Sequence, residues 1–177
     1  MTCVRYAADG WGVGELWLEG PRLVWHELPT PERDPHPGRG PSPPPSRSTI
    51  PAKGAHVRGE TAPEAQLLVH RFERYFAGEP VSFADVEVDA DGWTPFQQDV
   101  GSALRAVPYG EGVSYSDLAR AAGYPRAQRA AGTFCAGNRF ALVVPCHRVI
   151  GASGIGSYGS LGVDYKRRLL ALEGVTL

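Results

Sequence analysis

A cysteine followed directly by a histidine and an arginine is a candidate nucleophile, at Cys146, His147 and Arg148. A thiol attacks only as its thiolate, and its ordinary pKa of about 8.5 leaves it mostly protonated at neutral pH. An imidazole can take the proton, and nearby positive charge favours the thiolate that remains. A carboxylate is then needed to orient the imidazole, and Glu173 is the candidate. Because side chains of adjacent residues need not face each other, a bridging water could link Cys146 to His147.

The residues before Cys146 decide how firmly its side chain can be held. Residues 140–144, Phe-Ala-Leu-Val-Val, are a fully apolar run, which we interpret as a buried strand or extended segment. Pro145 ends that segment and biases Val144 to extended geometry. Cys146 therefore lies where a rigid segment stops, and such a position can fix a catalytic side chain tightly. A Cys-His pair by itself is more often an inert buried thiol, so the surrounding pattern must decide.

The other two cysteines, Cys3 and Cys135, indicate neither a disulfide framework nor a metal site. Three cysteines are an odd, sparse set, and a reducing compartment would keep them as free thiols. The sequence has no CxxC pair, and Cys3 with His26 would supply only two of the ligands that structural zinc requires. We therefore expect no metal and no cofactor, and we interpret Cys3 as a small buried hydrophobic side chain.

The composition is that of an ordinary globular protein, but the charge is unevenly divided. Of 177 residues, 42% are hydrophobic and 21% are charged. Residues 1–95 hold 9 Lys and Arg against 14 Asp and Glu, and residues 96–177 hold 9 against 5, so the halves carry −5 and +4. The basic half permits a polyanionic partner such as nucleic acid. No apolar run reaches the roughly 18–20 residues that cross a bilayer. Residues 1–6 also lack a secretory signal core, so a cytoplasmic protein without membrane contact is expected.

The N-terminal half predicts a small sheet and one helix, separated by a proline-rich segment. Residues 3–28 alternate or run apolar around turn-forming glycines, which is typical of short antiparallel strands. Nine of the 16 prolines fall between Pro29 and Pro51, and segment 29–60 is predicted to be a disordered insertion or linker. Apolar residues then recur at helical spacing over residues 64–76.

The C-terminal half predicts four short helices. Thr94 is a predicted N-cap, with Pro95 at the first helical position. Two further helices, one ending at Gly123 and one over about 126–136, form a candidate helix-turn-helix, whose second helix would enter a DNA groove. Helical hairpins are also common in protein cores, so this pattern alone leaves DNA binding and core packing equally open. The last helix is predicted over residues 164–172.

Several motifs occur in the order that one known family shows. Segment 145–151, Pro-Cys-His-Arg-Val-Ile-Gly, resembles the active-site signature of the O6-alkylguanine-DNA alkyltransferases (methylated-DNA–protein-cysteine methyltransferases), and the resemblance covers roughly residues 94–174. Further matching motifs are Phe96-Gln97-Gln98-Asp99-Val100, Val107-Pro108-Tyr109-Gly110-Glu111, Ser114-Tyr115, Arg129-Ala130-Ala131-Gly132, Gly137-Asn138, Tyr158-Gly159 and Leu169-Leu170-Ala171-Leu172-Glu173-Gly174. The N-terminal region matches only loosely, as a small sheet with a helix.

The resemblance implies a repair reaction that each molecule carries out once. A helix-turn-helix would enter the minor groove, and an O6-alkylated guanine would be flipped into a pocket, because the alkylated oxygen cannot meet a buried thiolate while the base is stacked. The alkyl carbon would pass to the cysteine by direct displacement and leave a stable thioether. The implied partner is double-stranded DNA that contains alkylated guanine, and the protein is expected to be a monomer.

The resemblance implies a role for each residue at the reactive centre, assigned by its position in the matching motif. Cys146 would accept the alkyl group, His147 would act as base through water, and Glu173 would orient His147. Asn138 would brace the turn before the active-site segment. Tyr115 would help to rotate the nucleotide and would donate a hydrogen bond to the leaving guanine, whose developing charge a phenol can stabilise.

The resemblance also implies contacts with DNA and with the flipped base. Arg129 would fill the stack that the base leaves, because a guanidinium is planar and carries several donors. The other residues assigned to DNA contact are Tyr115, Ala130, Gly132 and Phe134. The pocket is assigned to Tyr158, Gly159 and the carbonyl of Val149, which would read the guanine amino group. Without the surrounding pattern, Tyr115 would be a core aromatic and Arg129 a solvated helix residue.

The chain departs from the family pattern at four positions. Gly101 stands where tryptophan is frequent, and Phe134 stands where the recognition helix usually has a small residue. Cys135 and Arg139 are also unusual, since a proline commonly follows the asparagine. A Phe134 that faces the groove could weaken DNA docking, whereas one that faces inward is a core residue.

Two other functions stay open at this point. A non-catalytic damage-binding protein, similar to the alkyltransferase-like proteins, would lack the acceptor cysteine, which is present here as Cys146. A cysteine hydrolase that acts on esters or amides would need an oxyanion hole and would turn over repeatedly.

The sequence predicts an α/β (α+β) fold in two parts. Residues 1–28 and 61–92 would form a small sheet-and-helix domain. Residues 93–177 would form a mostly helical, winged-helix-like domain that carries the helix-turn-helix, with Cys146 in a restricted pocket near its second helix.

Overall fold

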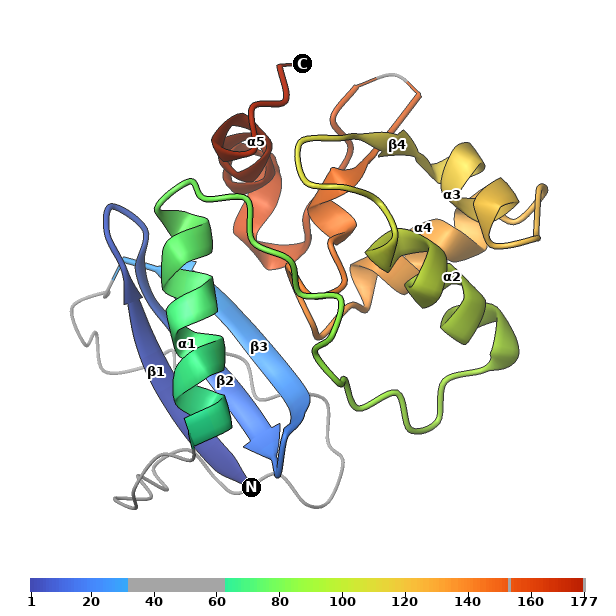
Figure 1. The fold of residues 1–177 in the computed structure, drawn as a ribbon. Coiled ribbons are helices and arrows are strands. Elements are labelled where there is room, and N and C mark those ends of the chain that lie inside the picture. Colours follow the sequence, from blue (N-terminus) through green and yellow to red (C-terminus); the bar gives the residue numbers. More distant parts are fainter. Residues whose placement is uncertain (32–62, 153, 177) are drawn as a thin grey trace, which may run out of the picture.

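The computed structural model describes residues 1–31, 63–152 and 154–176. A three-stranded sheet with one helix comes first, and a region of short helices follows (Figure 1). In chain order the elements are β1 (Thr2–Ala8), β2 (Gly12–Glu19), β3 (Arg22–Thr30), α1 (Pro63–Phe76), α2 (Pro95–Arg105), β4 (Val113–Ser114), α3 (Tyr115–Ala121), α4 (Gln128–Ala136), the 3-10 helix η1 (Cys146–Arg148), β5 (Val149–Ile150), the 3-10 helix η2 (Gly159–Leu161) and α5 (Gly162–Leu172). The predicted α+β fold class is confirmed.

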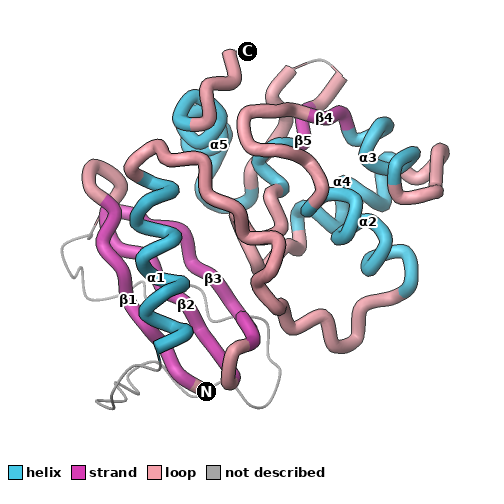
Figure 2. Tube along the Cα trace, viewed as in Figure 1, coloured by secondary structure: helices cyan, strands magenta, loops and turns pink. Residues whose placement is uncertain are grey.

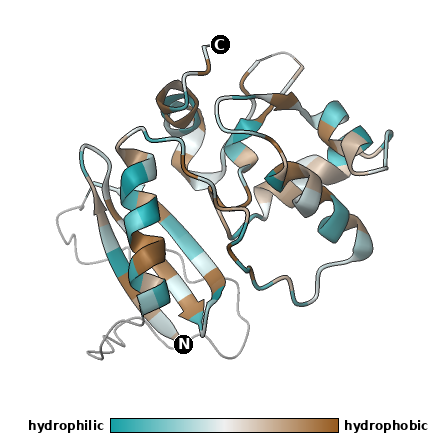
Figure 3. Ribbon diagram, viewed as in Figure 1, coloured by the Kyte–Doolittle hydropathy of each residue, from teal (hydrophilic) through white to brown (hydrophobic). Residues whose placement is uncertain are grey.

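The N-terminal sheet is an antiparallel meander in the order β1-β2-β3, and α1 lies across one face of it (Figure 1). Alternate strand residues point to that face, as the pleat requires. The helix buries an apolar stripe against them, formed by Leu68, Phe72, Tyr75 and Phe76. Figure 3 shows apolar and polar residues alternating along α1 and the strands, which is the pattern of amphipathic elements around one core.

The predicted proline-rich segment lies outside the described residues, except at its start. Strand β3 continues through Pro29 and Thr30, two residues past the predicted boundary. The carbonyl of Pro29 accepts a hydrogen bond from Tyr165 Oη at 2.8 Å. This contact joins the end of the sheet to α5, near the C-terminus.

Helix α2 starts as the sequence predicts. Thr94 Oγ1 accepts a hydrogen bond from Gln97 N, and Gln97 Oε1 accepts one from Thr94 N, so the two residues form a capping box with Pro95 at the first helical position. Helices α2, α3 and α4 pack on one another, and α3 and α4 are the two helices of the predicted helix-turn-helix. Figure 2 shows that helices and loops make up most of this C-terminal region.

The second of these helices begins later than predicted. Residues 124–127 form a turn, closed by a hydrogen bond from Ala127 N to Tyr124 O at 2.9 Å, and α4 begins only at Gln128. Pro125 therefore lies in the turn that connects α3 to α4.

The strand predicted for residues 140–144 is wrong, because this apolar run folds as a turn. Val144 N donates to Phe140 O at 2.7 Å, and Leu142 has a φ of 70°. Strand β3 holds the turn from outside: His26 N donates to Arg139 O at 2.9 Å, and His26 Nδ1 donates to Ala141 O at 2.7 Å. The run is buried as predicted, but these contacts from a distant part of the chain select the turn.

Among residues 1–31, 63–152 and 154–176, no helix is long and apolar enough to cross a bilayer. Within the same ranges, no three His, Cys, Asp or Glu side chains are grouped so as to hold a metal ion. Both ring nitrogens of His26 are engaged in hydrogen bonds and are not available as metal ligands: Nε2 lies 2.7 Å from Tyr6 Oη, and Nδ1 donates to Ala141 O in the turn.

His26 makes the stability of the fold depend on pH. Burial lowers the pKa of His26 from 6.5 to about 4. Between these values the unfolded chain takes up a proton that the folded chain does not, so the free energy of unfolding decreases as the pH falls through this range, by about 3 kcal/mol. His26→Asn should remove this part of the pH dependence in urea unfolding, while His70→Asn, at an exposed position, should keep it. Equal slopes for wild type and His26→Asn would contradict the assignment.

Candidate active site

The Cys146 thiol lies at the start of η1, directly after the turn that β3 holds. The residue is 8% exposed, and Val143 and Val144 before it are buried. Asn138 spans the turn: its Nδ2 lies 3.1 Å from Cys146 Sγ and donates to Val144 O at 2.7 Å, and its Oδ1 accepts from Phe140 N at 3.0 Å. Asn138 therefore fixes both ends of the turn and the sulfur together.

Electrostatics around Cys146 leave its thiol protonated in the resting protein. Burial raises the pKa of Cys146, and the hydrogen bond from Asn138 and the charge of Lys166 oppose this only in part. A proton acceptor is consequently needed before the sulfur can act as a nucleophile.

The proton acceptor is His147, which belongs to a buried cluster around Glu173, directly after α5. His147 Nε2 lies 2.7 Å from Glu173 Oε1, and neither side chain is exposed. Arg148 binds both carboxylate oxygens, from Nε to Oε2 at 2.9 Å and from Nη2 to Oε1 at 3.0 Å. Gly110 N donates to Oε2 at 3.1 Å. Burial raises the pKa of Glu173, but the hydrogen bonds from His147 and Arg148 outweigh burial and hold that pKa far below its usual range.

These contacts fix the tautomer of His147. Because Nε2 faces a carboxylate, Nε2 carries the proton, and Nδ1 is left as the basic nitrogen. Nδ1 is buried and has no hydrogen-bond partner among the described residues. Burial lowers the pKa of His147, against the raising effect of Glu173, so the ring is neutral and able to accept a proton.

Two further buried residues, Lys166 and Tyr75, belong to the surroundings of Cys146 and Glu173. Neither of them was assigned a role from the sequence. Lys166 is 0% exposed, and its Nζ donates to Val149 O at 2.5 Å. Burial lowers the pKa of Lys166, while the nearby Cys146 raises it. A signal was present in the sequence, because Lys166, Leu169 and Leu170 form the buried stripe of α5 at helical spacing. Tyr75, from α1, donates to Glu173 Oε1 at 2.6 Å; its place in the buried stripe of α1 was visible in the sequence, but its contact with Glu173 was not.

The residues assigned to the substrate pocket lie close to the thiol. Val149 pairs in parallel with Val113, and its carbonyl faces Lys166. Tyr158 is 9% exposed, and its hydroxyl has no hydrogen-bond partner among the described residues. Burial, and then the nearby Cys146, raise the pKa of Tyr158. Gly159 follows at the exposed start of η2.

The residues assigned to DNA contact fall into two groups. Arg129 and Ala130 are exposed on α4. Tyr115 is half-buried at the start of α3 and lies against Gly132, where an added Cβ would be 3.7 Å from the Tyr115 ring. Ala130 therefore leaves only a methyl group on the exposed face of α4, whereas a Cβ at Gly132 would touch the Tyr115 ring at ordinary van der Waals distance.

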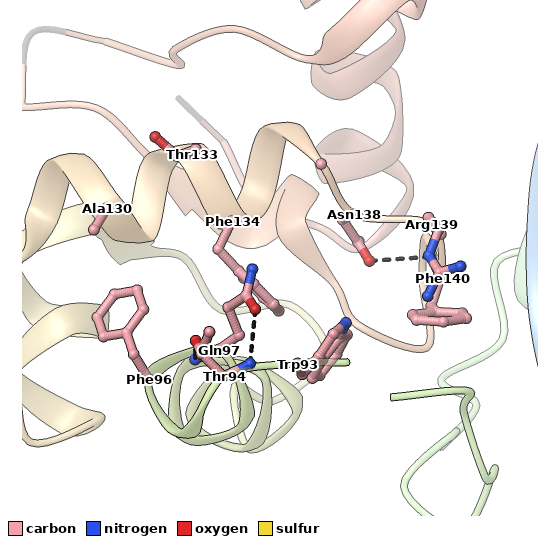
Figure 4. A pocket seen from close by; sticks show the side chains of 11 residues that line it. Trp93, Thr94, Phe96, Gln97, Ala130, Thr133, Phe134, Asn138, Arg139 and Phe140 are labelled. Carbon is pink, nitrogen blue, oxygen red and sulfur yellow. Dashed lines mark hydrogen bonds between the residues drawn. The ribbon is translucent and has the colours of Figure 1, made fainter. Parts of the chain in front are cut away.

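Phe134 is the exception, and its assignment to DNA contact is corrected. The side chain is 7% exposed and meets Trp93 edge to face, with ring centroids 5.1 Å apart. Figure 4 shows Phe134 directed from α4 toward α2, on the side where Trp93 and Phe96 lie. Phe134 is thus a core residue, the second of the two orientations that the sequence left open.

Trp93 and Phe134 also explain the glycine at position 101. A Cβ at Gly101 would come within 2.6 Å of Trp93 Cζ3 and 3.3 Å of Phe134 Cζ. Both rings occupy the space in front of α2 that a larger residue at position 101 would need. Beside them is a cavity of about 330 Å³, lined by Trp93, Thr94, Phe96, Gln97, Ala130, Thr133, Phe134, Gly137, Asn138, Arg139 and Phe140 (Figure 4). Cys146 and His147 do not line it.

Comparison with known proteins places this arrangement in a family. Residues 95–175 match the model described as 6-O-methylguanine DNA methyltransferase, DNA binding domain. A crystal structure of Mycobacterium tuberculosis OGT in complex with DNA is similar over 98% of this chain and 92% of that chain, with 35% identity and a TM-score of 0.72. The chain belongs to the methylated-DNA–protein-cysteine methyltransferase family. The membership predicted from the motifs around Cys146 is confirmed.

Curated members of the family match the chain over a shorter span. The methylated-DNA–protein-cysteine methyltransferase of Mycobacterium bovis is 51% identical over 106 residues, which are 59% of this chain and 62% of that protein. The protein of that name from Methanosarcina acetivorans is 49% identical over 105 residues, 59% of this chain and 65% of that protein. The alignments therefore span less than two thirds of these family members.

Gly101 provides a test of the aromatic packing of Trp93 and Phe134 beside α2. Alanine usually stabilises a helix interior over glycine by about 0.5–1 kcal/mol. Here we expect Gly101→Ala to lower the free energy of unfolding by about 1–2 kcal/mol, because overpacking costs about 1–3 kcal/mol. In a Trp93→Ala background the same change should be neutral or stabilising. Urea unfolding of wild type, the two single variants and the double variant gives the coupling free energy between positions 93 and 101. A coupling below about 0.5 kcal/mol would contradict the explanation that the Trp93 ring excludes a side chain at position 101.

Proposed function

We propose that the protein repairs DNA by moving the alkyl group of O6-alkylguanine to Cys146, once per molecule. The observation that carries this proposal is the buried Cys146 thiol, held by Asn138, next to the Glu173–His147 pair. The similar OGT of M. tuberculosis was crystallised in complex with DNA. The name of the curated relatives describes transfer from methylated DNA to a protein cysteine.

The first step is removal of the thiol proton. His147 Nδ1 is the free basic nitrogen, and a bridging water carries the proton from Cys146 Sγ to it. Glu173 stabilises the imidazolium that results, since its charge lies 2.7 Å from Nε2. The buried ammonium of Lys166 favours the thiolate.

The second step is direct displacement at the alkyl carbon. The thiolate of Cys146 forms a bond to that carbon, the bond from carbon to O6 breaks, and its electron pair stays on the guanine. Tyr115 Oη donates a hydrogen bond to the leaving base and stabilises its developing negative charge. The carbonyl of Val149 reads the guanine amino group, with Tyr158 and Gly159 beside the base. The thioether on Cys146 does not revert, so one molecule repairs one lesion.

Binding to double-stranded DNA is assigned to the outer face of α4. Arg129 and Ala130 are exposed there, and the C-terminal half carries +4 charge. We propose that α4 enters the minor groove and that the Arg129 guanidinium replaces the flipped base in the stack. Residues 93–177 thus bind DNA and carry the acceptor, residues 1–28 and 61–92 support them, and the protein acts as a monomer. A reducing cytoplasmic setting would keep Cys146 free.

Two features argue against the other functions that the sequence left open. A protein that only binds damage has no use for a thiol with a positioned base, which Cys146 and His147 provide. A hydrolase needs free backbone donors at the nucleophile, but Cys146 N donates to Val144 O at 2.8 Å.

Transfer can be tested by mass. Reduced protein incubated with duplex DNA that contains O6-methylguanine should gain one methyl group on the peptide that carries Cys146, in a stoichiometry of about one. Cys146→Ala should lose the adduct and still bind DNA. Cys135→Ala is the matched control, because this thiol lies on α4 and should not accept the group. Tight lesion binding by wild-type protein without an adduct would overturn the proposal in favour of a damage-binding function.

Arg129 should matter for duplex DNA and not for the chemistry. We expect Arg129→Ala to slow transfer from O6-methylguanine in duplex DNA by roughly tenfold or more, because stacking of a base on an aromatic side chain contributes about 1–3 kcal/mol and the planar guanidinium stacks in the same way. Transfer from the free base O6-benzylguanine should change little. Exposed Arg120→Ala, on α3, is the control. Equal losses on both substrates would contradict the stacking role.

A further inference from the structure

Tyr75 is a buried residue that the proposed alkyl transfer does not use, although it contacts the same carboxylate. It belongs to α1, the helix that covers the N-terminal sheet, and it is 0% exposed. Its Oη donates to Glu173 Oε1 at 2.6 Å and lies 3.3 Å from His147 Nε2. Its ring meets His147 edge to face, with centroids 6.5 Å apart.

We propose that Tyr75 is a positioning residue for His147, so that the N-terminal sheet-and-helix region completes the reactive site of the C-terminal region. Tyr75 would act through Glu173 and Nε2 and would touch neither the substrate nor the reacting sulfur. This inference rests on the proposed function for its consequence in repair, but its effect on His147 can be measured without any DNA.

The geometry allows the Tyr75 hydroxyl one arrangement of hydrogen bonds. A phenol has one proton, and Tyr75 donates it to Glu173 Oε1, so the Tyr75 oxygen can only accept toward Nε2. His147 Nε2 then faces two acceptors, the carboxylate and the phenol oxygen. Both require the proton on Nε2 and keep Nδ1 unprotonated and basic.

The hydroxyl also competes for the charge of Glu173. Oε1 accepts from Tyr75, from His147 and from Arg148 Nη2. Without Tyr75 two donors remain, and more of the negative charge acts on the imidazole. The protonated ring would then be favoured, and a protonated ring cannot accept the thiol proton.

Packing alone does not account for a tyrosine at this position. Phe72 and Phe76 on the same helix fill the same core without a hydroxyl. Burying a phenol costs free energy unless it finds a partner, and burial followed by the charge of Glu173 raises the pKa of Tyr75 well above its usual value. The hydroxyl is therefore always protonated and serves as a permanent donor to Glu173.

The titration of His147 depends on all the groups that face it. Burial lowers the pKa of His147 below its ordinary value, Glu173 opposes this, and the charges of Arg148 and Lys166 add to the lowering. Tyr109 packs against the Tyr75 ring, with centroids 6.0 Å apart, and donates its hydroxyl away from the cluster, to Leu172 O. Tyr75 is the neutral donor among these groups, so removal of its hydroxyl changes the pKa of His147 without removing a charge.

The test compares Tyr75→Phe with Tyr6→Phe in the full chain. Tyr6 is a matched control, because it loses a buried hydroxyl in the same core, where its partner is His26 and not Glu173. The imidazole nitrogens of His147 are followed by NMR against pH. Alkyl transfer from O6-methylguanine DNA and alkylation of Cys146 by iodoacetamide are followed over the same pH range.

For Tyr75→Phe we expect the His147 titration and the acid limb of both reactions to move to higher pH by about one unit. On the acid limb, at pH values below the wild-type pKa of His147, both reactions should slow by roughly tenfold at a given pH, since one hydrogen bond to a charged group is lost. Tyr6→Phe should leave all three profiles in place. Unchanged profiles for Tyr75→Phe, or equal shifts for both variants, would overturn the positioning role.

A second replacement covers the case in which Tyr75→Phe fails to fold. Placing 3-fluorotyrosine at position 75 keeps the ring and makes the hydroxyl a stronger donor, so the profiles should move to lower pH. A shift to higher pH, or none, would contradict the inference. If wild-type protein transfers no methyl group but Tyr75→Phe still shifts His147 and the iodoacetamide profile, the proposed function fails while the positioning role stands.

Discussion

The buried carboxylate of Glu173 is the interaction on which the rest of the structure depends. It accepts five hydrogen bonds from Tyr75, Gly110, His147 and Arg148, which come from α1, the turn after α2, and η1. An ionised group without partners is very costly inside a protein, and breaking a buried ion pair costs about 3–5 kcal/mol. The elements that supply these donors must therefore meet at one point, and this requirement orients the sheet-and-helix region against the helical region.

The thiol is held by a second, separate set of contacts. Asn138 fixes the turn before Cys146, and β3 holds the same turn from outside through His26. The Cys146 sulfur thus lies between a rigid turn and the Glu173 cluster, with Lys166 as the buried cation nearby. Burial keeps the Cys146 thiol protonated and unreactive until a base takes its proton, which fits the proposed single transfer.

Two of the four departures from the expected family pattern, Gly101 and Phe134, meet in one packing arrangement. Gly101 is small because the Trp93 ring lies 2.6 Å from where its Cβ would be, and Phe134 closes the same space from α4. The space beside position 101, where the resemblance led us to expect tryptophan, is filled here by Trp93 and Phe134. Phe134 therefore leaves the outer face of α4, where Arg129 and Ala130 are exposed, unobstructed.

By itself, the sequence determined the features that depend on neighbours along the chain. The capping box at Thr94, the helical stripe of α1 and the motif around Cys146 are local, and each was predicted from spacing or residue type. Tertiary structure decided the rest. Residues 140–144 are apolar enough for a strand, but hydrogen bonds from His26 make them a turn. Tyr75 reaches Glu173 across 98 residues, and no local pattern encodes a contact at that separation, because it exists only once the two regions have packed together.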